Sequence, residues 1–173
     1  DKYDKEGTEQ VVKAATTLGG KVLIILLAVL LSYSLYKGKI KSPIVSTSSY
    51  PVKACDYILE NIDMENMRIF NEYNYGSYML FRGIPVFIDS RADLYTPEFN
   101  GVKGEDGKYK GQDIFSDYIN ISNISTYYET KFDKYDITHV LIRKNSKLNM
   151  FLSRDEETYK ELYSDDNFVL YER

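Results

Sequence analysis

The chain has 173 residues, with 22 Lys and Arg against 26 Asp and Glu, one Cys and one His. The charge is uneven: residues 1–49 carry a net charge of +3 and residues 50–173 a net charge of −7. The acidic part lacks the basic face that binds a phosphate backbone, which excludes a nucleic-acid partner. One cysteine excludes an internal disulfide, and Cys55 and His139 leave too few ligands for a Cys- or His-based metal site. We expect neither a metal nor a cofactor.

An apolar run near the start predicts a membrane helix. Residues 22–36, VLIILLAVLLSYSLY, are uncharged and mostly aliphatic. As a helix they span about 22 Å, short of the hydrocarbon core of about 30 Å, and the helix can extend backwards with Lys21 reaching the interface. A buried globular helix would need the polar face that this run lacks, and a signal peptide would need a cleavage motif after it. The predicted organisation is a juxtamembrane segment at 1–20, a transmembrane helix at 21–36, a linker at 37–50 and a soluble domain at 51–173.

The residues on either side of this helix do not determine its orientation in the membrane. Lysines stand in nearly equal numbers on both sides, so the positive-inside rule does not choose a direction. The sequence begins at Asp1 without Met, which favours a piece of a longer polypeptide or a processed product. After the helix, KSPIVSTSSYP at 41–51 has two prolines and a Ser/Thr run, a composition typical of extended chain. It would hold the following domain close to the bilayer.

The acidic part alternates helix and strand patterns. The predicted helices cover 51–62, 75–83, 113–134 (as one helix or two) and 146–165. The predicted strands cover 67–73, 84–90, 137–144 and 167–173. This order predicts an α/β three-layer domain with a small, mostly parallel sheet of about four strands, the last strand being antiparallel and at an edge. The Gly-rich, charged stretch 98–113 fits neither a phosphate loop nor a calcium loop, so we expect a mobile surface loop, with a substrate lid as the alternative.

Polar side chains gather after two predicted strands, in FNEY (70–73) and IDSRADLY (88–95). In an open α/β sheet, ligands bind beyond the carboxyl ends of the strands. An arginine fork suits a phosphate or a carboxylate, and carboxylates accept from sugar hydroxyls. The alternative is structural, because Asp89 and Arg91 flank one residue and can pair with each other. The candidate ligand-binding residues are Asn71, Tyr73, Asp89, Arg91, Asp93 and Tyr95; we assign no catalytic residue.

Two isolated residues are given structural roles. Cys55 falls at helical spacing among apolar residues, which predicts a small buried side chain rather than a reactive thiol. His139 interrupts the apolar run ITHVLI, which predicts a hydrogen-bonded histidine of the core or strand face rather than a catalytic one.

The order of these segments resembles a known family. An apolar helix and a Ser/Pro linker are followed by YPVKACDYI, RIFNEYNYGSYMLFRGIPVFIDSRADLY, a variable loop, YDITHVLI and NFVLYER. Residues 50–173 thereby resemble the C-terminal region of bacterial polytopic membrane proteins related to GT-C type, mannosyltransferase-like glycosyltransferases. The most specific part is 69–95. It departs from the family pattern at Tyr75, where Trp is usual, and at Ser77 and Ser90, where Gly is usual.

The resemblance implies a protein that transfers a sugar from a polyprenyl-phosphate carrier at the outer face of the cell membrane. The family's catalytic carboxylate lies in an upstream loop that this sequence does not contain. We therefore expect a non-catalytic extracytoplasmic accessory domain, with the N-terminus of the helix inside. Its partners would be the bilayer and a polyprenyl-phosphate-linked sugar or its acceptor. The alternatives are a membrane-anchored sensor or ligand-binding module, and a purely structural interaction domain.

Overall fold

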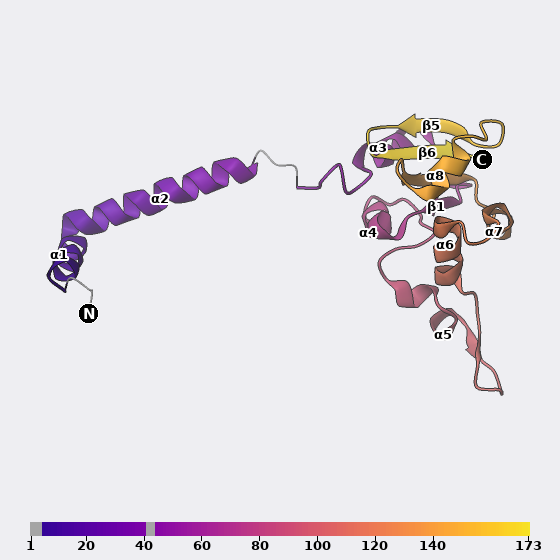
Figure 1. The fold of residues 1–173 in the computed structure, drawn as a ribbon, viewed down its shortest axis with the longest axis horizontal. Helices are drawn as coiled ribbons and strands as arrows, with labels where there is room; N and C mark the ends of the chain where they lie inside the picture. The colour runs from indigo at the N-terminus through magenta and orange to yellow at the C-terminus, as the bar shows by residue number, and fades with distance from the viewer. Residues whose placement is uncertain (1–4, 41–43) are drawn as a thin grey trace. The chain divides into compact units, whose positions relative to one another are not determined.

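The computed structural model describes residues 5–40 and 44–173, which divide into two compact units, Asp1–Ile44 and Val45–Arg173. The first unit contains α1 (Lys5–Thr16) and α2 (Leu18–Ile40) (Figure 1). The two helices meet closely, since a Cβ on Gly20 would fall 2.0 Å from the carbonyl oxygen of Ala14. By length and composition, Leu18–Lys37 is the one described stretch that could cross a membrane, with a mean hydropathy of 2.1. The expected juxtamembrane segment therefore contains a separate helix, α1.

The second unit is built on a four-stranded sheet in the order β1-β4-β6-β5. Its strands are β1 (Ile69–Asn71), β4 (His139–Arg143), β5 (Lys160–Ser164) and β6 (Phe168–Glu172). β1 runs parallel to β4, whereas β6 is antiparallel to both β4 and β5. The sheet is thus mixed, and the prediction of a mostly parallel sheet was wrong. The last strand is antiparallel as predicted, but it lies inside the sheet rather than at an edge.

The predicted long helix at 146–165 accounts for this difference. It is replaced by a short helix, α8 (Lys147–Leu152), and by β5, which turns directly into β6. Asp165 closes this turn, because its Oδ1 accepts from the amides of Asn167 at 2.8 Å and Phe168 at 2.9 Å. A hairpin joins antiparallel neighbours without a crossover. The tight turn therefore places β6 between β5 and β4.

Residues 84–90 also differ from the prediction, since they form no strand. Ile84 and Ile88 are fully buried, which explains the strand-like apolar pattern. Pro85 has no N–H to give to a ladder. The Phe87 amide and the Ile88 carbonyl bond instead to the side chain of Asn71, the last residue of the edge strand β1. One amide side chain thus provides the pairing that a neighbouring strand would have supplied.

Helices cover both faces of the sheet, which confirms the three-layer arrangement. α3 (Val52–Asn61) and α4 (Tyr73–Phe81) pack on one face, where Leu141, Phe168 and Leu170 point. The other face is covered by α6 (Ile114–Asn123), α7 (Tyr128–Lys134) and α8. Val140 and Ile142 point to this second face, so the side chains of β4 alternate between two apolar cores. Cys55 is fully buried in the first core, and burial raises the pKa of its thiol to about 12.

The stretch 98–113 has more local structure than the loop that was expected. α5 (Pro97–Asn100) leads into a two-stranded hairpin of β2 (Val102–Lys103) and β3 (Tyr109–Lys110). Its turn uses Gly107 at a φ of +77°, a conformation that favours glycine. Asn100 closes the base by donating to the carbonyl of Gln112 at 2.7 Å and accepting from its amide at 2.9 Å.

Candidate functional site

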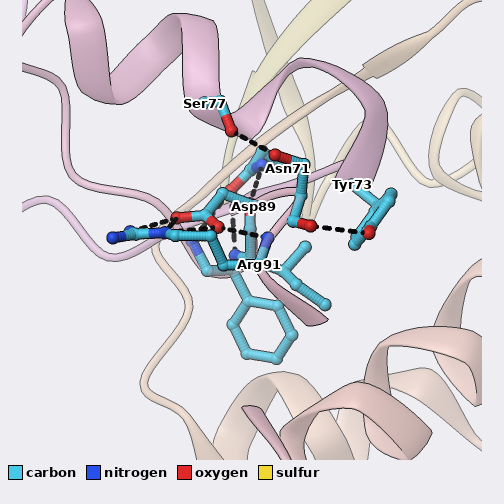
Figure 2. A network of polar contacts seen from close by, with 8 residues as sticks. Asn71, Tyr73, Ser77, Asp89 and Arg91 are labelled. Atoms are coloured by element: carbon cyan, nitrogen blue, oxygen red, sulfur yellow. Dashed lines mark hydrogen bonds and ion pairs between the residues drawn. The ribbon is translucent and has the colours of Figure 1, made fainter. Parts of the chain in front are cut away.

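The candidate residues lie where β1 ends and α4 begins, against the segment 87–95 (Figure 2). Asn71 is fully buried at the centre of this cluster. Its Nδ2 donates to the carbonyl of Ile88 at 2.8 Å, and its Oδ1 accepts from the amide of Phe87 at 2.8 Å. Both polar atoms of the side chain are thereby used in hydrogen bonds to the backbone. Asn71 positions the segment that carries Asp89 and Arg91.

Asp89 and Arg91 form the ion pair of the cluster. Arg91 Nη2 lies 2.5 Å from Asp89 Oδ2, and Arg91 Nε donates to Oδ1 at 3.0 Å, so the contact is bidentate. The Arg91 amide also donates to Oδ1, at 2.8 Å. The hydrogen bonds from the Arg91 side chain are the main reason that the pKa of the Asp89 carboxyl is lowered.

The two partners differ in their exposure to solvent. The Asp89 side chain is fully buried, whereas 60% of the Arg91 side chain is exposed. Figure 2 shows the guanidinium lying along the Asp89 carboxylate, with its far end pointing away from the cluster. A guanidinium has five N–H donors, more than one carboxylate can take. Arg91 is therefore held in one orientation and presents unused donors on the outside.

Tyr73 and Ser77, both on α4, hold the next residue of the segment. The Tyr73 hydroxyl donates to the carbonyl of Ser90 at 2.8 Å, and the hydroxyls of Ser77 and Ser90 lie 2.7 Å apart. The Tyr73 ring packs edge-on against Phe115 of α6, with centroids 6.1 Å apart. Tyr73 is thus used within the fold, and it joins the segment 88–91 to both α4 and α6.

Asp93 and Tyr95 lie on a short 3-10 helix, η1 (Ala92–Tyr95). Tyr95 is half-buried, and its pKa is raised by burial and by its hydrogen bond with Asp89. Asp93 is exposed, and within the described part of the chain its carboxylate makes no hydrogen bond or ion pair. The structure therefore brings Asn71, Tyr73, Asp89, Arg91 and Tyr95 together and leaves Asp93 at the margin.

A close backbone approach makes this cluster possible. A Cβ on Gly76 would fall 2.0 Å from the carbonyl oxygen of Ile88 and 2.8 Å from the Cα of Asp89. Only glycine lets α4 lie directly on this segment. The resemblance pattern contains this glycine, but its packing partner could not be read from the sequence.

Sequence reasoning missed a second buried acid, Asp117 on α6. Its Oδ1 lies 2.7 Å from Lys131 Nζ, and its Oδ2 lies 2.7 Å from Lys134 Nζ and accepts from the Tyr135 hydroxyl at 2.6 Å. Burial would raise the pKa of this carboxyl, but the hydrogen bonds from the two lysines and Tyr135 outweigh it and lower the pKa to about 2. The lysines three residues apart on the next helix were the available signal.

Glu72 and His139 are two further polar residues near the sheet. Glu72 Oε1 accepts from the amide of Arg143 at 3.0 Å, and burial raises the pKa of this carboxyl. His139 Nδ1 lies 2.8 Å from the hydroxyl of Thr138, and burial lowers its pKa. Across residues 5–40 and 44–173, no group of three or more His, Cys, Asp or Glu could hold a metal ion.

Comparison with protein-family models, with curated proteins and with solved structures finds no match to this chain. The molecule is therefore defined by its own features. These are a mixed α/β domain, an apolar helix of spanning length, and a buried cluster that presents one exposed arginine.

Proposed function

We propose that residues 45–173 form a non-catalytic, extracytoplasmic domain of a membrane protein that handles a polyprenyl-phosphate-linked sugar or its acceptor. The single observation that carries this proposal is the exposed guanidinium of Arg91, fixed by the buried carboxylate of Asp89. A preoriented arginine binds phosphate well, because the planar fork loses little freedom on binding. The apolar stretch Leu18–Lys37 supplies a means to keep this group near a membrane.

A purely structural interaction domain is the second candidate. Asn71, Tyr73 and Asp89 already use their polar atoms on backbone groups or on Arg91. On this view the cluster exists to fix the segment 87–91 on α4. The two functions differ in one respect: only the first requires the outer side of Arg91 to meet an anion.

The test is a binding measurement on the full chain in lipid nanodiscs. We would follow the amide and arginine side-chain NMR signals while adding a short-chain isoprenyl phosphomannose, the isoprenyl phosphate alone, and a neutral isoprenyl mannoside. We expect saturable shifts at residues 89–95 with both phosphates and none with the neutral compound. Absence of saturable shifts at millimolar phosphate in the folded protein would overturn phosphate binding and favour the structural role.

A matched pair of variants separates binding from folding. The double variant Asp89→Asn with Arg91→Gln removes both charges and leaves no unpaired buried carboxylate. The control is Asp56→Asn with Arg82→Gln, because Asp56 of α3 and Arg82, the residue after α4, form a second ion pair with Arg82 Nη2 2.7 Å from Asp56 Oδ1. Loss of the shifts in the first variant and their retention in the second would tie the effect to Arg91.

The side of the membrane is tested independently of any ligand. Glu105→Cys places a thiol in the exposed hairpin turn, whereas the native Cys55 is fully buried and resists labelling. We expect a membrane-impermeant maleimide to label Cys at position 105 in intact cells. Labelling only after cell lysis would contradict the extracytoplasmic location and leave phosphate binding untouched.

A further inference from the structure

The C-terminal end of α4 carries an exposed apolar surface. Phe81, the last residue of the helix, is 83% exposed. Phe81 follows Tyr78 by three residues, so the two side chains lie on the same side of α4. Exposing an entire phenylalanine ring to water is unfavourable. Covering this surface with apolar groups would therefore stabilise the protein.

The chain enters the domain at the same place. The ring of Tyr50 lies 5.4 Å from that of Tyr78, centroid to centroid. Arg143 fixes the preceding residues, since Nη1 donates to the carbonyl of Ser48 and Nη2 to that of Ser49, both at 3.1 Å. Figure 1 shows the chain reaching the domain beside α3 and α4, away from α6 and α7. The entry point and the exposed end of α4 are thus neighbours.

The tether that leads to this entry point is short. Ser48 is the eighth residue after Ile40, the end of α2, so eight steps of the chain join the two residues. Fully extended, they reach about 28 Å. A domain of this size has a radius of gyration of about 14 Å. If α2 crosses a bilayer, this reach keeps Ser48 within about 28 Å of the residue at which α2 ends.

We infer that Tyr50, Tyr78 and Phe81 form a lipid-contact surface, which lies in the interface of the bilayer that α2 spans. Aromatic rings are favoured at that depth, and an exposed phenylalanine buries apolar area there. Arg82 follows directly, and its ion pair with Asp56 leaves no unpaired cation beside this surface. The inference rests on the membrane anchoring in the proposed function, and not on its ligand.

This contact would also place the candidate site. Ser77 precedes Phe81 by one helical turn, about 6 Å along the axis of α4. Ser77 bonds to Ser90, the residue next to Arg91. Phe81 and the contact with the segment that carries Arg91 are therefore one turn apart on the same helix.

The absence of tryptophan from the sequence gives a clean test. Phe81→Trp introduces a single tryptophan into the full chain, which is reconstituted into phosphatidylcholine vesicles with either ordinary or acyl-brominated lipids. We expect emission about twofold lower in the brominated vesicles, because an interfacial ring lies within reach of the acyl chains. The control is Phe151→Trp on α8, 48% exposed, since α8 packs on the opposite face of the sheet. We expect its emission to be unchanged by bromination.

The outcomes separate this inference from its premise. Flotation of the full chain with the vesicles is measured first, and failure to float would overturn the anchoring itself. If the chain floats and Trp at 81 is no more quenched than Trp at 151, the lipid-contact surface is wrong. A blue-shifted but unquenched Trp at 81 whose emission depends on protein density would assign the surface to a second copy of the chain, which also overturns the inference.

Discussion

Asp89 and Asp117 are both buried carboxylates held by cations, yet the fold builds the two sites differently. Asp89 has one cationic partner, Arg91, which is two residues away and mostly exposed. Asp117 has two, Lys131 and Lys134, which come from the next helix. The first arrangement presents a charged group to solvent, whereas the second joins α6 to α7. The comparison teaches that a buried acid can either hold a cation at the surface or join two helices, depending on where its partners lie.

The largest expected effect comes from Gly76, which lets α4 lie directly against the segment that carries Asp89. Gly76→Ala should lower the free energy of unfolding by about 4 kcal/mol, because the new methyl group must displace the backbone at Ile88 and Asp89. Chemical denaturation followed by circular dichroism measures this. Asn74→Ala, at an exposed position of the same helix, is the control and should change stability little. A stable Gly76→Ala protein would show that α4 does not need its close approach to this segment.

The second prediction compares the loss of one cation in each cluster. Arg91→Ala should lower the melting temperature by about 8 °C, because it leaves a fully buried carboxylate without its ion-pair partner. Lys134→Ala should lower it by about 2 °C or less, because Lys131 still pairs with Asp117. Differential scanning calorimetry at neutral pH checks both. Equal decreases in melting temperature would mean that the number of cationic partners does not determine how much stability is lost when one of them is removed.

A pH dependence of stability is expected from the Asp117 cluster. Its folded pKa of about 2 lies below the unfolded value of about 3.9. Such a carboxyl adds stability above its unfolded pKa, and this is lost as pH falls from about 4 to about 2. We expect about 2 kcal/mol to disappear over this range, and Asp117→Asn to lack that loss. Denaturation curves of both proteins at several pH values provide the measurement. Parallel losses in the two proteins would assign the acid sensitivity to other carboxyls, Asp89 among them.

The sequence predicted local features well. The apolar helix, the helices at 51–62 and 75–83, the strand at 137–144 and the burial of Cys55 all follow from short-range patterns of apolar residues. The contact between Asp89 and Arg91 could also be predicted from the sequence, because side chains two residues apart on an extended chain point to the same side. Their pairing was one of the two alternatives that the sequence left open.

Partners distant in the chain could not be read in this way. The strand-like apolar run at 84–90 is not a strand because Asn71, more than ten residues earlier, takes its backbone groups. The helical pattern at 146–165 gives way to β5 because β6 offers a pairing edge. In both places tertiary pairing outweighs a local preference.

The sequence by itself determined that this protein has an apolar helix of near-spanning length, a short polar link and an acidic α/β domain, since these depend on composition and period. The tertiary structure alone decided that the sheet is mixed, that Asn71 and Tyr73 serve the backbone, and that Arg91 faces outward. It also decided that Tyr50 packs against Tyr78 and that Phe81 is exposed. The physical reason is that exposure and hydrogen bonding depend on groups that only folding brings within reach of one another.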